Sequence, residues 1–129
     1  MMTIKEGYCI TYDFLLSYWQ TVDKYRTYSK DDSFTLVTII STMNPEIKNN
    51  PSPIDSSKYD DWKFVLKQLY QNKSQYTEME IFNGLIAYLE FFKNNYHFTI
   101  QEVIDDILKS INGKYHEDWN SIVLNNTKE

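Results

Sequence analysis

Apolar side chains recur at helical spacing along most of this chain, and the pattern predicts α-helices rather than strands. From Ile10 to about Tyr28 the apolar positions follow the spacing i, i+3, i+4, i+7, which places them on one face of a helix. The same stripe recurs in five later segments: 32–43, 55–69, 77–92, 99–111 and 115–123. The pattern therefore predicts an all-α fold, a bundle of about six helices.

One of these segments also permits a strand. Residues 34–42 are rich in β-branched side chains, which favour extended backbone. No partner strand is visible elsewhere in the sequence, so we expect a helix that Asp32 or Ser33 caps. The pair Asn44-Pro45 should end this helix, because the residue before a proline is disfavoured in the α conformation. The sequence alone leaves helix and strand open for residues 34–42.

Two later helix starts carry the pattern of a capping box. In Thr77-Glu78-Met79-Glu80 the threonine hydroxyl can accept from the backbone N–H of Glu80, whose carboxylate reaches back to the threonine N–H. The segment from Thr99 to Glu102 has the same spacing. We therefore expect the fourth and fifth helices to begin at these threonines, and Gly113 to end the fifth.

The helices are expected to form a single domain over residues 1–129. A chain of this length buries roughly two-thirds of its unfolded surface, whereas either half alone is too small for a good core. The Asn- and Pro-rich stretch 44–54 is therefore interpreted as a loop between two helical hairpins, and residues 125–129 are expected to fray. Seven residues are predicted to form the centre of the core: Phe82, Leu85, Leu89, Val103, Ile104, Ile107 and Leu108.

Charge and aromatic content bear on the kind of partner. The formal net charge is −5, whereas nucleic-acid binders concentrate Lys and Arg, so we expect a basic protein rather than a nucleic acid as direct partner. The 11 tyrosines exceed what one core needs, and part of this surplus is expected at the surface, where tyrosine serves protein interfaces. A tryptophan that proves exposed would be the leading candidate for an interface anchor.

The chain is expected to reside in the cytoplasm. Its single cysteine, Cys9, precedes the first predicted helix and has no partner for an intramolecular disulfide. Residues 1–9 lack the apolar run of a signal peptide. No stretch approaches about 18 apolar residues, so a membrane span is not expected.

Signals of catalysis are few, and no enzyme, metal or cofactor is expected. His97 and His116 lie outside any metal-binding spacing, and the three glycines are too far apart for a phosphate-binding loop. His116 and the acids near it offer ligands for a cation, but adjacent carboxylates on a helix point about 100° apart, and a solvated face is the simpler interpretation. A small hydrolase would need a deep pocket with clustered titratable groups.

Acidic residues concentrate in the second half of the chain. From Glu78 to Asp118 there are eight acids and three lysines, so this segment alone carries a net charge of −5. Some of these acids lie in first helical turns, where the helix dipole favours them. Six carboxylates on three predicted helices are our candidates for contact with a basic partner: Asp60, Asp61, Asp105, Asp106, Glu117 and Asp118.

The block Glu80-Ile-Phe-Asn-Gly-Leu-Ile-Ala-Tyr-Leu-Glu-Phe-Phe92 resembles a block in small bacterial immunity proteins, including proteins of contact-dependent growth inhibition systems. In that family a Glu and a Phe precede an apolar face that ends in aromatic-Leu-Glu-x-aromatic. A short apolar element with an Asp follows, as in Val103–Ile107 here, and the motif closes on Asp118-Trp119. The resemblance covers roughly residues 77–123.

The resemblance implies a cytoplasmic inhibitor that binds the toxic C-terminal domain of a cognate effector and blocks its active site or substrate surface. Toxins of this kind are often nucleases, which need basic surfaces, and an acidic helical protein suits such a partner. A helical adaptor or regulatory protein-binding module without a toxin partner is the alternative, and it predicts no preference for basic partners. A shared fold would not identify the toxin, because function depends on surface residues.

Overall fold

Six helices make up most of the computed structural model, which describes residues 1–21, 30–43, 56–71, 73–110 and 115–127. They are α1 (Ile4–Thr21), α2 (Lys30–Met43), α3 (Ser56–Tyr70), α4 (Glu78–Tyr96), α5 (Gln101–Ser110) and α6 (His116–Thr127). The all-α prediction is confirmed, and segment 34–42 is helical. The predicted loop 44–54 and the stop at Gly113 lie outside the described residues. No described helix is both long and apolar enough to cross a bilayer.

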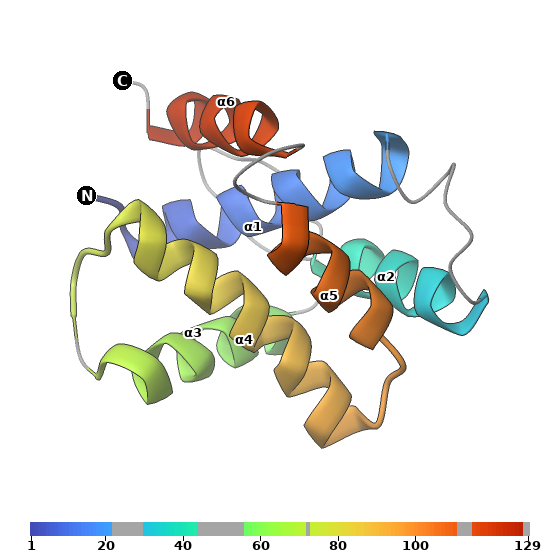
Figure 1. Ribbon diagram of the computed structural model, residues 1–129. Helices are drawn as coiled ribbons and strands as arrows, with labels where there is room; N and C mark the ends of the chain where they lie inside the picture. Colours follow the sequence, from blue (N-terminus) through green and yellow to red (C-terminus); the bar gives the residue numbers. More distant parts are fainter. Residues whose placement is uncertain (22–29, 44–55, 72, 111–114, 128–129) are drawn as a thin grey trace.

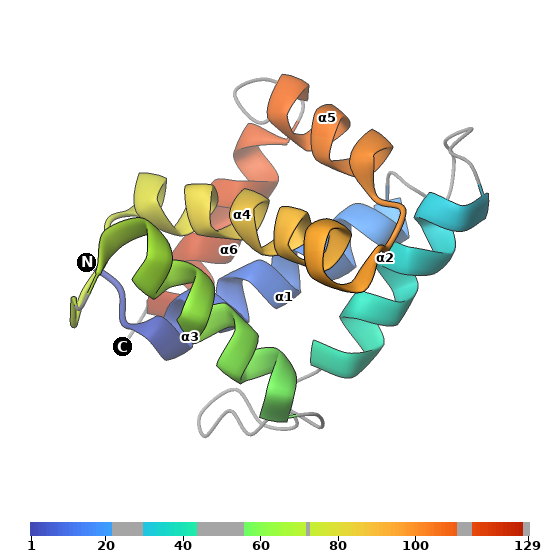
Figure 2. The ribbon, with the colours of Figure 1, turned by 90° about the horizontal axis from the view of Figure 1, so that it is seen from below.

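α1 occupies the centre of the bundle, and the other helices are arranged around it (Figure 2). It packs most extensively on α6, although these two helices come from opposite ends of the chain (Figure 1). Aromatic rings fill this contact, with the centroid of Phe14 5.5 Å from Trp119 and the centroid of Tyr18 5.4 Å from Tyr115. α3 packs on α4, and α5 rests on both α4 and α2. The core therefore surrounds α1.

The starts of α1 and α4 are built in the same way. Met2 and Tyr76 pair as an antiparallel bridge, with Met2 N donating to Tyr76 O at 2.8 Å and Tyr76 N to Met2 O at 2.7 Å. Each bridge residue is followed by a threonine that forms a complete capping box, Thr3 with Glu6 and Thr77 with Glu80.

The second of these boxes confirms the predicted start of α4, whereas the first was not predicted. α1 begins at Ile4 rather than Ile10, so Cys9 lies inside this helix and is buried rather than preceding it. The apolar stripe that guided the prediction begins only at Ile10, whereas the capping box at Thr3 starts the helix two turns earlier.

The capping box predicted at Thr99 is wrong. The backbone N–H of Glu102 donates to Asp32 Oδ2 at 2.9 Å, so the acceptor comes from α2, 70 residues away in sequence. Asp32 does not cap its own helix, because α2 already begins at Lys30. Its side chain is buried and reaches across to the first turn of α5, where a carboxylate satisfies a free N–H and meets the positive end of the helix dipole.

Trp62 joins α1, α3 and α4. Its ring is fully buried, and its Nε1–H donates to Ile4 O at 3.1 Å. Gly7 of α1 and Gly84 of α4 flank the ring, and a Cβ atom added at either position would lie 3.1 Å from it. That spacing is tighter than ordinary van der Waals contact, so the two glycines allow the helices to close on the indole.

Six of the seven residues predicted at the centre of the core are buried, and Leu108 is not. Its side chain is 50% exposed. The buried stripe comprises Ile100, Val103, Ile104 and Ile107, and at 100° per residue Leu108 lies about 90° round the helix from its centre. α5 packs on α4 and α2, and the half-exposed Leu108 lies outside the buried stripe.

The tyrosine surplus lies mostly inside the molecule. Of the nine described tyrosines, five are buried, three are half-buried and only Tyr96 is exposed. Tyr8 OH donates to Met43 O at 2.9 Å, and Tyr88 OH donates to Lys58 O at 2.8 Å. Phenols thus bond backbone carbonyls of neighbouring helices, which explains why so many tyrosines fit in one core.

The C-terminal tail is more ordered than predicted. α6 continues to Thr127, and Asn126 Nδ2 donates to Asp13 Oδ2 on α1 at 2.9 Å and to Ile122 O at 2.9 Å. The prediction of fraying from residue 125 is therefore wrong for residues 125–127, because this side chain fixes the last turn against α1.

Candidate protein-binding surface

The six candidate carboxylates do not share one surface. They lie in three pairs on α3, α5 and α6. α3 and α6 lie on opposite sides of α1, with α6 above and α3 below it in Figure 1, and α3 in front with α6 behind in Figure 2. A partner that covers the α6 pair therefore cannot also cover the α3 pair.

The α3 pair lies among lysines and aromatic rings. Asp60 is exposed and forms an ion pair with Lys63, with 3.3 Å between the nitrogen and the carboxylate oxygen. Asp61 accepts from Tyr96 OH at 3.1 Å, and the Lys58 ammonium lies 4.9 Å from the centroid of the Tyr96 ring. These cations offset the two acids, which makes this face a poor match for a basic partner.

Two of the remaining acids hold the bundle together. Asp106 Oδ2 accepts from Tyr18 OH at 2.6 Å and from Tyr115 OH at 2.7 Å, so it ties α5 to α1 and to the residue before α6. Asp118 Oδ2 accepts from Ser17 Oγ at 2.9 Å, which joins α6 to α1. Both carboxylates are half-buried. Removing either would break hydrogen bonds that join buried or half-buried hydroxyls of different helices.

Asp105 and Glu117 are exposed and belong to what we call the acidic end. It comprises the end of α1, the starts of α2 and α6, and α5; in Figure 1 α1 ends and α2 begins at the right, whereas α6 begins nearer the middle. The bonds from α1 to Asp106 and Asp118, and from α5 to Asp32, bring these helices together. Among its described residues the exposed acids are Asp31, Glu102, Asp105 and Glu117, against the exposed cations Lys30 and Lys109.

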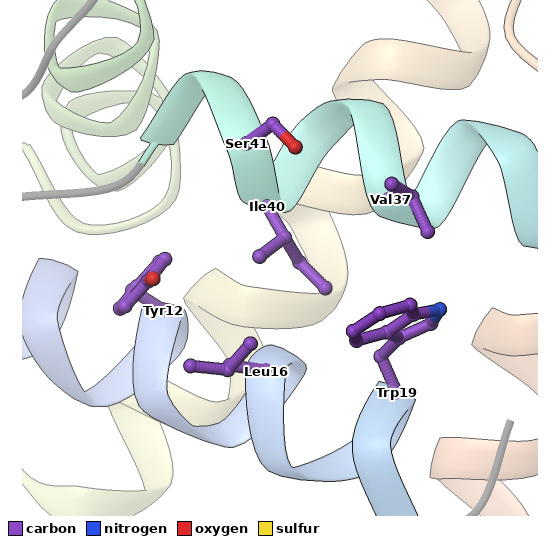
Figure 3. Close-up of a pocket in the computed structure, with 6 residues that line it drawn as sticks. All are labelled: Tyr12, Leu16, Trp19, Val37, Ile40 and Ser41. Carbon is purple, nitrogen blue, oxygen red and sulfur yellow. The ribbon is translucent and has the colours of Figure 1, made fainter. Parts of the chain in front are cut away.

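An apolar groove opens between α1 and α2. It has a volume of about 210 Å³ and is lined by Tyr12, Leu16, Trp19, Val37, Ile40 and Ser41. Figure 3 shows these side chains extending from the two helices, with the Trp19 ring beside Val37 and with Leu16 and Ile40 facing each other. Trp62 and Trp119 are buried, whereas Trp19 is partly exposed. No tryptophan among the described residues is fully exposed, and Trp19 is the most accessible of the three.

The groove adjoins negative charge. The pKa of the Tyr12 phenol is raised from its ordinary value of 10.0, first by partial burial and second by the neighbouring Asp13 carboxylate. Asp13 is half-buried and accepts a hydrogen bond from Asn126 of α6. Ser17 and Tyr18, which bond the acids of α6 and α5, lie about 130° round α1 from the groove at 100° per residue. The groove and these two acids are therefore on different faces of α1.

The volume of the groove decides what kind of group it can hold. Clefts that bind small molecules usually have about 300–1,000 Å³. The groove is smaller than this, at about 210 Å³, and its lining is largely apolar and aromatic. It suits one bulky apolar side chain of another protein better than a whole substrate molecule.

The groups considered for chemistry are dispersed. His97 ends α4 in a left-handed conformation with φ 57°, and His116 contacts Asn120 at the start of α6. In the part of the chain that the structure describes, no three His, Cys, Asp or Glu side chains lie close enough together to share a metal ion.

Comparison with protein-family models, with curated proteins and with solved structures finds no match. The interpretation of the surface therefore depends on its own geometry. The sequence indicated the acids and the value of an exposed tryptophan, but the α2 wall of the groove carried no signal, because its residues are ordinary positions of an amphipathic helix.

Proposed function

We propose that this protein is an immunity protein, which binds the toxic C-terminal domain of a cognate effector in the cytoplasm and neutralises it. The partner is a basic protein domain, and a nuclease is the class of toxin that best meets this requirement. The proposal combines the resemblance at Glu80–Phe92 with the surface of the folded chain.

The observation that carries the proposal is that the surface offers both an apolar groove with a partly exposed tryptophan and exposed acids on α5 and α6. Protein interfaces commonly have an aromatic or aliphatic anchor at the centre and charged residues around it. Trp19 supplies the anchor, and exposed acids such as Asp105 and Glu117 supply charge that attracts a basic partner and speeds its association. An adaptor without a toxin partner would not need an apolar anchor combined with exposed acids.

The resembling block supports the fold more than the binding surface. Phe82, Leu85, Leu89 and Phe92 are all buried. Residues at these positions pack the core and do not contact a partner, so the binding surface must come from other parts of the chain. This separation explains how related inhibitors can share a framework and still recognise different toxins.

Co-expression with the toxin domain encoded beside this gene tests the proposal. The wild-type protein should restore growth, and the two purified proteins should form a complex whose association slows as salt is added. An active-site variant of the toxin serves as the control for expression. Failure of the wild-type protein to restore growth would remove the immunity proposal and favour an adaptor.

Charge reversal at Asp105 and Glu117 tests the choice of surface. Both residues are exposed, so Asp105→Lys with Glu117→Lys should leave the fold intact, slow association and weaken its salt dependence. Reversal at Asp106 is a poorer test, because this residue accepts from two tyrosines. Asp60→Lys on α3 changes the net charge by the same two units as each single reversal and is the control for Asp105→Lys and Glu117→Lys taken one at a time. Equal association rates for the single reversals and the control would mean that the partner binds elsewhere.

A further inference from the structure

We draw no further inference here: the strongest candidate, the outer face of α2 on which Phe34 is 74% exposed, is an unpartnered apolar face, and nothing in the structure shows what covers it.

Discussion

Replacing Asp32 tests the contact in which α2 caps α5. Asp32→Ala removes the acceptor of the Glu102 N–H, whereas Asp32→Asn keeps an acceptor oxygen in nearly the same place. Thr99→Ala provides the comparison, because Thr99 is the residue that local sequence rules select as the cap, and its side chain is exposed. The three variants therefore compare the long-range cap with the local one.

The expected loss follows from the geometry of the contact. A hydrogen bond to a charged group contributes about 1.5–3 kcal/mol, and the 2.9 Å distance and burial of Asp32 place this contact in that class. Asp32 has further interactions in the structure, so Asp32→Ala should lose at least about 1.5 kcal/mol of unfolding free energy. Asp32→Asn should lose less, and Thr99→Ala should lose under about 0.5 kcal/mol, as is usual at exposed sites.

Urea denaturation followed by far-ultraviolet circular dichroism measures these losses. Thr77→Ala is the positive control, since that capping box is formed and its loss should cost about 0.5–2 kcal/mol. Amide hydrogen exchange should locate the effect of Asp32→Ala in the first turn of α5. The reasoning fails if Asp32→Ala is silent, or if Thr99→Ala costs as much as Thr77→Ala.

Three further predictions concern the core and the dependence of stability on pH. Leu89→Ala should cost about 2–5 kcal/mol because the side chain is fully buried, whereas Leu108→Ala at a half-exposed site should cost far less; chemical denaturation of both checks the register of α4 and α5. The pKa of Glu80 is lowered from 4.5, first by its hydrogen bond with Lys73, so its stabilising contribution is present above pH 4.5 and is lost as the pH falls through the lowered pKa. Acid titration of Lys73→Gln should show a smaller loss over that interval. Burial raises the pKa of Tyr88 well above 10.0, so the stability that its neutral phenol contributes is present below pH 10.0 and is lost as the pH rises. Tyr88→Phe lacks this phenol, so its free energy of unfolding should fall less over the alkaline interval, with tyrosinate absorbance as the readout.

Helices could be predicted from sequence wherever the signal is local. The apolar stripes gave all six helices, and the capping box at Thr77 gave the start of α4, because both depend on residues within a few turns. The same local rule failed at Thr99, where Asp32 takes the position of the expected acceptor. A capping motif states which groups can bond, but tertiary packing decides which acceptor is present.

The binding surface could be predicted less completely from the sequence, because it too depends on tertiary packing. The sequence identified the acids, yet Asp106 and Asp118 bond hydroxyl groups of α1 that are 88 and 101 residues away. Nothing in the local pattern distinguishes these carboxylates from the exposed Asp105. The groove likewise needs α1 and α2 to be placed side by side, so its α2 wall appears only in three dimensions.

The packing of α1 on α6 constrains how the protein is made. Among the described residues the two helices form the largest helix–helix contact, yet α1 leaves the ribosome well before α6. About 95 residues separate Thr21 from His116, so at about 5–20 residues per second the face of α1 around Phe14 waits roughly 5–20 s for Trp119. A messenger that stops before α6 therefore yields a chain with this aromatic face uncovered, and such a chain is a substrate for the chaperones and proteases that sort incomplete proteins.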